Sequence, residues 1–211
     1  MNDQVRKPPA TRAPRGRPEM SQDARNQMRE KIAKAAEDLF RESGYAAVSM
    51  RKIAASVGCT PMALYSYFPA KIDILQTLWG GVFDAVFSKV NSASRKSGPT
   101  DTLLSISTVY VTYWLTNPDH YRLVFMSEGV TQPDVGLFLD QPDSVARFGV
   151  FARAIADTCC SPLDPSVLKM KLDLLLCLLH GIVHNTITIS GYEWTAPGDL
   201  ISQGIKSIAG N

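Results

Sequence analysis

The chain has 211 residues, of which 45% are hydrophobic and 20% are charged. These ordinary values exclude wholesale disorder and fibrous repeats, and the length allows a small domain attached to a larger one. The longest apolar run, residues 174–179, is too short to cross a bilayer, and no apolar segment follows the basic N-terminus to form a secretory signal. We therefore expect a cytoplasmic protein that does not enter a membrane.

Charge is divided unevenly along the chain. Residues 1–72 contain 13 Lys and Arg against 7 Asp and Glu, a balance of +6, whereas the remainder contains 9 against 13, a balance of −4. This asymmetry indicates that the N-terminal third meets a polyanion and that the rest has another task.

Residues 1–20 contain four prolines and five basic residues with almost no large apolar side chain, which predicts a flexible basic arm. Within it, Pro14-Arg15-Gly16-Arg17-Pro18 resembles the core of an AT-hook. In that motif a slim Arg-Gly-Arg backbone enters the narrow minor groove of A·T-rich DNA. Arg15 and Arg17 are thus candidate DNA contacts; the alternative is a disordered, solubilising tail.

Helical signals begin at Ser21, whose hydroxyl can cap a segment with apolar residues at helical spacing that ends near Gly44. A short second helix fits residues 49–57, with Ser49 as its cap and Gly58 for the left-handed turn that stops it.

Thr60 then caps a third helix, and Pro61 takes the first helical position, where its missing N–H costs nothing. Two short helices joined by a tight, glycine-containing turn form a helix-turn-helix.

The remaining pattern stays helical, and no stretch shows the period-two alternation of a strand. We expect helices over 71–92, 102–115, 120–128, 144–160, 166–190 and 198–209, with loops at 97–100, 129–141 and 192–197. The predicted fold is all-α with about nine helices. It has a flexible arm (1–20), a helix-turn-helix domain (21–70) and an effector-binding and dimerisation domain (71–211).

The third helix should lie in the major groove, as the second helix of a helix-turn-helix does. Leu64 and Phe68 share one face and can pack on the first two helices. The other side chains of this segment are free for DNA: Met62, Ala63 and Ser66 for base edges, and the Tyr65 and Tyr67 hydroxyls for phosphates. Lys71 begins the next helix, whose positive end also favours a phosphate.

The segment GYAAVSMRKIAASVGCTPMALYSYFPAKIDIL resembles the DNA-binding signature of the TetR family of transcriptional regulators, over roughly residues 25–76. The resemblance implies phosphate contacts from Ser49, Tyr65, Tyr67 and Lys71, and base contacts from Thr60, Pro61, Met62, Ala63 and Ser66; Arg51 is a further candidate. Pro61 and Met62 stand where the family often has a polar residue and a glycine. We therefore expect apolar contact with thymine methyls to carry more of the readout here.

The resemblance also implies that the later helices enclose a ligand pocket and that the last two pair with those of a second subunit. Residues 166–190 are apolar nearly all round between 172 and 183, which favours a homodimer interface shared with 198–209. Two-fold symmetry then predicts a near-palindromic operator with half-sites roughly 34 to 36 Å apart.

Eight residues of the predicted helices after residue 71 are candidates to line a pocket for an apolar or aromatic effector. They are Trp79, Phe83, Tyr110, Trp114, Phe125, Phe148, Cys177 and His180. The plain alternative is that these residues form core. The segment around Tyr110 to Trp114, with Leu178-Leu179-His180-Gly181, is similar to a subclass named for a Trp-His-Gly motif, although the tryptophan is absent before His180.

Other chemistry is less well supported. Cys177, His180 and His184 share a helix face at zinc-ligand spacing, but one helix rarely supplies a tetrahedral site, and we expect no metal or cofactor. The adjacent Cys159 and Cys160 favour an inert helix terminus over a redox switch. The sequence lacks GxSxG, HExxH and phosphate-binding glycine motifs, so we do not expect an enzyme.

The predicted function is a ligand-responsive, sequence-specific regulator, a repressor released from its double-stranded DNA operator by a small-molecule effector. The alternative is an architectural DNA-binding protein without an effector.

Overall fold

A computed structural model describes residues 21–94, 98–131, 133–135, 142–159 and 161–209. In chain order its helices are α1 (Gln22–Ser43), α2 (Met50–Val57), α3 (Pro61–Tyr65), α4 (Lys71–Ala93), α5 (Pro99–Thr116), α6 (Pro118–Phe125), α8 (Pro142–Asp157), α9 (Pro165–Thr188) and α10 (Pro197–Ala209). The described residues contain no strand, so the all-helical class is confirmed.

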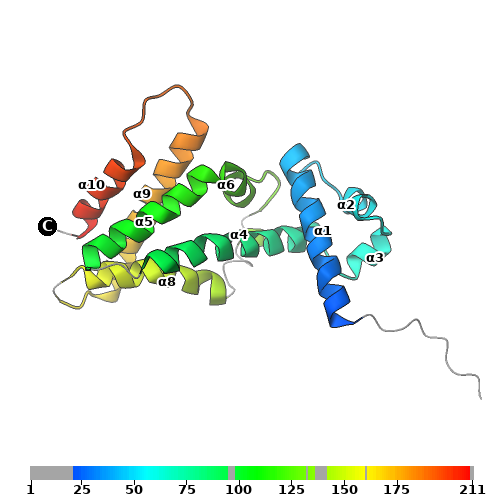
Figure 1. Cartoon of the computed structure of the whole chain (residues 1–211), viewed down its shortest axis with the longest axis horizontal. Helices are drawn as coiled ribbons and strands as arrows, with labels where there is room; N and C mark the ends of the chain where they lie inside the picture. The colour runs from blue at the N-terminus through cyan, green and yellow to red at the C-terminus, as the bar shows by residue number, and fades with distance from the viewer. Residues whose placement is uncertain (1–20, 95–97, 132, 136–141, 160, 210–211) are drawn as a thin grey trace, which may run out of the picture.

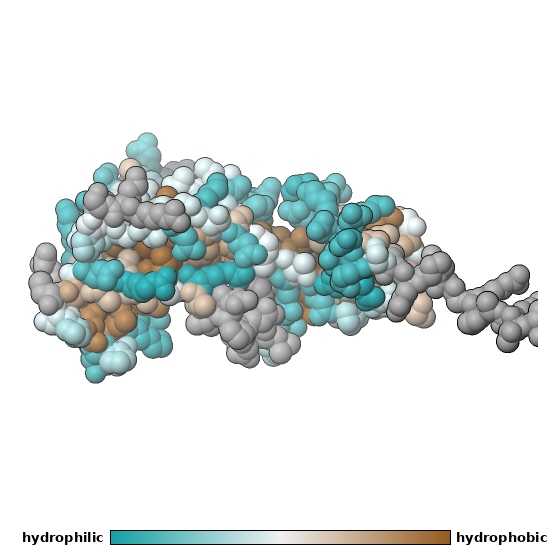
Figure 2. All heavy atoms as spheres, turned by 60° about the horizontal axis from the view of Figure 1, so that its bottom comes forward, coloured by the Kyte–Doolittle hydropathy of each residue, from teal (hydrophilic) through white to brown (hydrophobic). Residues whose placement is uncertain are grey.

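The molecule is elongated (Figure 1). Helices α1, α2 and α3 lie at one end, and α4 runs from them into a bundle formed with the later helices. On the face that Figure 2 shows, the N-terminal end is mostly hydrophilic, whereas hydrophobic side chains reach the surface over the C-terminal half.

The ends of the first helices lie where their capping residues predicted them. Ser21 Oγ accepts a hydrogen bond from the Ala24 N–H at 3.2 Å, and Gly44 follows the last residue of α1 with φ of 76°. This positive φ lets the chain leave the helix at a sharp angle without the strain a side chain would add.

Five of the later helices begin one to three residues before the predicted positions, because each starts at a proline. Proline suits the first helical turn, where its N–H would have no partner and its fixed φ is already helical. The corrected starts are Pro99, Pro118, Pro142, Pro165 and Pro197. Residues 99, 100 and 197, predicted as loop, are therefore helical, and α6 ends at Phe125 rather than at residue 128.

One continuous hydrophobic core connects the two ends of the molecule through α4. Ile74 and Leu75 in the first turns of α4 are fully buried and join a core that includes Ile32 and Phe40 of α1. Further along α4, Val86 belongs to the core shared with the bundle. The boundary predicted between residues 70 and 71 thus falls where the shared helix begins. No helix within the described ranges is both long and apolar enough to cross a membrane.

Candidate DNA-binding surface and effector site

Local hydrogen bonds fix the geometry of the helix-turn-helix. Ser49 Oγ accepts from the Lys52 N–H at 3.3 Å, and Thr60 Oγ1 accepts from the Ala63 N–H at 3.2 Å, so each short helix is capped at its start. Between the helices, Gly58 adopts a left-handed conformation with φ of 75° and ψ of 32°. The chain therefore turns from α2 into α3 within the few residues that the sequence predicted.

Helix α3 divides into a buried and an exposed side. Leu64 and the following Phe68 are fully buried, as predicted. Met62 on the other side is 80% exposed and Tyr65 is 47% exposed, although both are large and partly apolar. The described candidates for DNA contact are all exposed or half-buried: Ser49, Arg51, Thr60, Pro61, Met62, Ala63, Tyr65, Ser66, Tyr67 and Lys71. The surface predicted to meet DNA is thus accessible.

Two arginines of α1 hold the end of α3, and the sequence reasoning missed them. Arg25 Nη2 donates to the Ser66 carbonyl oxygen at 2.8 Å, and Arg29 Nη1 donates to the carbonyl oxygen of Tyr67. The Arg29 guanidinium also lies over the Phe68 ring, 4.1 Å from its centre. These charged donors satisfy carbonyls that a five-residue helix leaves open at its C-terminus. The available signal was the pair of arginines four apart, which places both on one face of α1.

Lys71, predicted to contact phosphate, is engaged within the protein. Its Nζ donates to the carbonyl oxygens of Tyr45 at 2.8 Å and Val48 at 2.9 Å and lies 4.0 Å from the centre of the Tyr45 ring. Burial lowers the pKa of Lys71. At the same helix start, Asp73 Oδ2 accepts the Ala70 N–H at 2.7 Å. The ammonium therefore stabilises the loop before α2, and its phosphate contact stays a prediction. Arg15 and Arg17 lie outside the described residues.

The aromatic residues predicted to line an effector pocket gather around Phe83. The centre of its ring lies 6.2 Å from those of Trp114 and Phe148 and 6.3 Å from that of Phe125, in edge-to-face arrangements. Trp79 is buried beside them, and its indole N–H donates to the Leu123 carbonyl oxygen at 3.0 Å. The rings pack directly on one another; Phe83, Trp79 and Trp114 belong to the core, whereas Phe125 is 42% exposed. Their role toward a ligand stays a prediction.

A polar pair, the buried Tyr110 and the half-buried His180, completes this cluster. The Tyr110 hydroxyl lies 2.9 Å from His180 Nε2, and the His180 ring centre is 4.7 Å from that of Phe125. Burial lowers the pKa of His180 to about 4 and raises that of Tyr110, so both groups are neutral at pH 7. On the same helix as Tyr110, the fully buried Ser107 hydroxyl has no hydrogen-bond partner among the described residues. These groups give an otherwise apolar region the means to orient a polar atom.

Cys177 is not brought into the cluster. Its side chain is exposed and lines a shallow hollow of about 230 Å³ with Leu178, Gly181 and Trp194. With His180 bonded to Tyr110, the zinc set considered for Cys177, His180 and His184 is not assembled. Within the described part of the chain no group of three or more His, Cys, Asp or Glu side chains is placed to hold a metal. Cys160 lies outside the described residues, so the inert helix terminus expected for Cys159 and Cys160 stays a prediction.

Helix α9 carries an exposed apolar face. Met170 is 56% exposed and Leu174 is 52% exposed, and both precede the exposed Cys177 on the same helix. Its other face packs closely on α10. A Cβ added to Gly204 of α10 would lie only 2.1 Å from Leu178 Cδ2 of α9, so no larger residue fits there without a shift. Large apolar side chains left exposed on one face are typical of a protein interface.

The geometry defines a structural class: an all-helical protein with an N-terminal helix-turn-helix and a helical C-terminal domain. The model of the family described as bacterial regulatory proteins, tetR family, matches residues 32–78, from within α1 to within α4. The match covers the helix-turn-helix and the first turns of α4, and the rest of the C-terminal bundle lies outside it.

Two curated relatives come from Mycolicibacterium smegmatis. The transcriptional repressor KstR is 30% identical over 80 residues, 38% of this chain and 39% of KstR. The transcriptional activator FasR is 27% identical over 112 residues, 53% of this chain and 51% of FasR. The chain thus matches about half of these relatives or less.

The solved structure of PfmR, a TetR family transcriptional regulator from Thermus thermophilus, is similar in fold along most of both chains. The TM-score is 0.58 at 15% identity, and the similarity covers 84% of this chain and 96% of PfmR.

Proposed function

We propose that the chain is a dimeric, sequence-specific transcriptional regulator that binds double-stranded DNA in the cytoplasm through α3. The observation that carries this proposal is the build of α3. The helix is capped at its start and held at its end by Arg25 and Arg29, yet it exposes Met62 and Tyr65. A short helix held so firmly, with large side chains left in solvent, is suited to enter a major groove.

Dimerisation is supported by α9. Met170 and Leu174 would be buried by the same face of a second subunit, because a two-fold interface is self-complementary. Two copies of α3 would then face successive major grooves on a near-palindromic operator.

The proposed effector site is the cluster around Phe83, Tyr110 and His180. A small apolar or aromatic molecule can occupy it only by separating rings that now pack together, which would change how α4 and α5 meet. Because α4 also joins the core of the helix-turn-helix domain, such a change would alter the position of α3. By linkage, DNA must weaken effector binding by the factor by which the effector weakens DNA binding.

Repression is the direction proposed, with release of DNA by the effector. The similarity to a repressor, KstR, supports it, although FasR is described as an activator. A reporter gene under the operator distinguishes the two outcomes, since deletion of a repressor raises expression.

The test is binding of the purified protein to DNA from upstream of its own gene, at several salt concentrations, against a scrambled duplex. Preference for the native fragment with a protected near-palindrome is expected. Equal, steeply salt-dependent binding to both duplexes would contradict the proposal and favour an architectural protein.

A further inference from the structure

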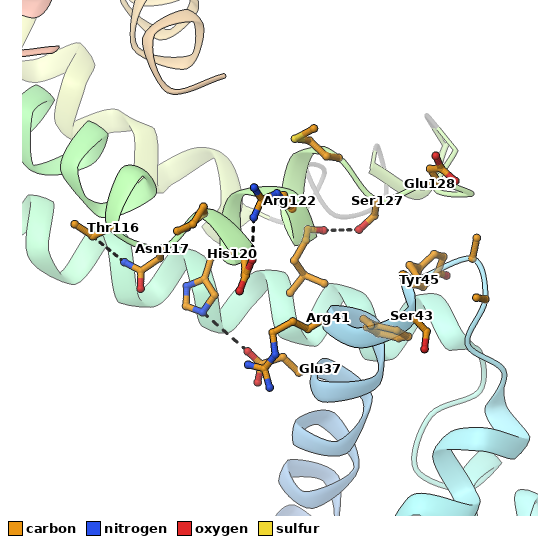
Figure 3. Close-up of a pocket in the computed structure, with 18 residues that line it drawn as sticks. Glu37, Arg41, Ser43, Tyr45, Thr116, Asn117, His120, Arg122, Ser127 and Glu128 are labelled. Carbon is orange, nitrogen blue, oxygen red and sulfur yellow. Dashed lines mark hydrogen bonds and ion pairs between the residues drawn. The ribbon is translucent and has the colours of Figure 1, made fainter. Parts of the chain in front are cut away.

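A cavity of about 610 Å³ lies between the helix-turn-helix domain and the C-terminal bundle. One wall comes from the end of α1 and residues 43–47, and the other from the end of α5, α6 and residues 126–128 (Figure 3). This volume falls in the range of small-molecule sites. The cavity is separate from the buried ring cluster proposed above for the effector.

The two guanidinium groups of the lining are neutralised by neighbouring carboxylates. Arg41 Nη2 lies 2.6 Å from Asp38 Oδ1, and Arg122 Nη1 lies 3.0 Å from Asp119 Oδ1. Each pair joins residues of one helix, so neither arginine is available to an anion without losing its partner.

Carboxylates exceed guanidinium groups in the lining. Glu37, Asp119 and Glu128 stand against Arg41 and Arg122. Among the described residues Glu128 has no ion-pair partner.

Glu37 is the carboxylate best placed for a ligand. Its side chain is 25% exposed, Oε2 accepts from exposed Lys34 at 3.1 Å, and Oε1 lies 4.0 Å from His120 Nε2. Figure 3 shows Glu37 and His120 pointing toward each other from α1 and α6. His120 Nδ1 is bonded to the Tyr113 hydroxyl at 2.9 Å, which fixes the orientation of the ring. One oxygen of Glu37 therefore lies at the junction of the two domains.

Apolar side chains line the cavity beside these charges. Phe40 and Tyr45, both largely buried, line one wall, and Leu123 and Met126 line the other. Burial, and to a smaller degree the charges of Asp134 and Asp73, raise the pKa of Tyr45. A carboxylate next to aromatic and aliphatic surface favours a cation with an apolar body.

We propose that this cavity binds a small amphipathic organic cation, an amine whose ammonium group pairs with Glu37 and whose apolar body lies over Phe40 and Leu123. Such a ligand touches both α1 and α6. It therefore bridges the DNA-binding domain and the bundle directly, without entering the ring cluster. This site goes beyond the proposed function because it is separate from the effector site in the ring cluster. Its binding of an amine can be measured without DNA.

The test uses three probes with one phenylbutyl body: 4-phenylbutylamine, 4-phenylbutanol and 4-phenylbutyrate. Isothermal titration of the full chain should give about tenfold tighter binding for the amine than for the alcohol, and weaker binding still for the carboxylate. Glu37→Gln should remove the preference for the amine and leave alcohol binding unchanged. Glu42→Gln changes a carboxylate of the same helix that does not line the cavity, and should leave all three affinities unchanged.

Amide chemical shifts locate the probe independently of the variants. Changes on adding the amine should concentrate at residues 43–47 and 117–123. Three titration results with the wild-type chain would overturn the proposal: equal affinity for the amine and the alcohol, tighter binding of the carboxylate, or no saturable binding at millimolar concentration. It would also be overturned if Glu37→Gln kept the preference for the amine, or if the chemical-shift changes were confined to the α9 region. A separate operator titration shows whether the protein binds DNA, so failure of the DNA proposal is distinguishable from failure of this one.

Discussion

The two ends of the molecule are stabilised in different ways. In the helix-turn-helix domain, α2 and α3 are too short to be stable alone, and hydroxyl caps and the donors of Arg25 and Arg29 satisfy their backbone groups. In the bundle the helices are long, and ring-on-ring packing provides the contacts. Directional hydrogen bonds therefore fix the position of α3, whereas the apolar packing of the bundle can rearrange around a bound ligand.

The dimer face should show the largest effect of a single change. Leu174→Asp places a charge in the proposed interface, so the protein should sediment as a monomer. Its operator affinity should fall at least about 100-fold, because the second half-site no longer adds to binding. Val135→Asp alters an apolar side chain that is 37% exposed outside α9 and should leave the dimer intact. A dimer that survives Leu174→Asp would disprove an interface on this face.

Removing the Arg29 contact tests whether polar contacts hold α3. Arg29→Ala deletes a charged hydrogen bond to Tyr67 and the contact over Phe68, and should lower the free energy of unfolding by about 2 kcal/mol. DNA affinity should fall with it. Urea unfolding measures the first and fluorescence anisotropy the second. Arg41→Ala, which loses only an exposed pair within α1, should cost less than about 0.5 kcal/mol. Equal costs would remove the special role of Arg29.

Acid should destabilise the bundle through His180. Its pKa is about 4 in the folded protein, below the ordinary value, so the unfolded chain binds a proton more readily. Stability is full above about pH 6.5 and is lost as the pH falls toward 4, by about 2 kcal/mol at pH 5. His180→Gln keeps a group able to bond Tyr110 and should flatten this dependence in thermal unfolding. His184→Gln, an exposed histidine of the same helix, should not.

The smallest expected effect on stability, with a clear effect on function, is at Met62. Met62→Ala should change the free energy of unfolding by less than about 0.5 kcal/mol, since the side chain is 80% exposed. Operator affinity should fall by about 1 kcal/mol while the salt dependence stays the same, because no charge is removed. Unchanged affinity for the operator would show that Met62 does not read a base.

The helix-turn-helix could be predicted because its signals are local. Ser49, Gly58 and Thr60 each act on backbone groups within a few residues, so their spacing sufficed. The same kind of local signal was available at the prolines that begin α5, α6 and α9, where the predicted helices began one to three residues late because the proline was left outside the helix. The contacts of Arg25 and Lys71 depend on partners 41 and 26 residues away, which no local pattern reveals.

Local patterns in the chain were enough to establish the helical class and the helix-turn-helix, because helix caps, turn glycines and apolar spacing act over one or two turns. Which charged side chains are occupied within the protein was settled by tertiary packing, since that depends on residues distant in sequence. Packing also made Phe83 and Trp114 neighbours, left Leu174 exposed and placed a charged cavity between the domains. These properties follow from how the helices meet, because the same apolar residue can face a core, a pocket or a partner.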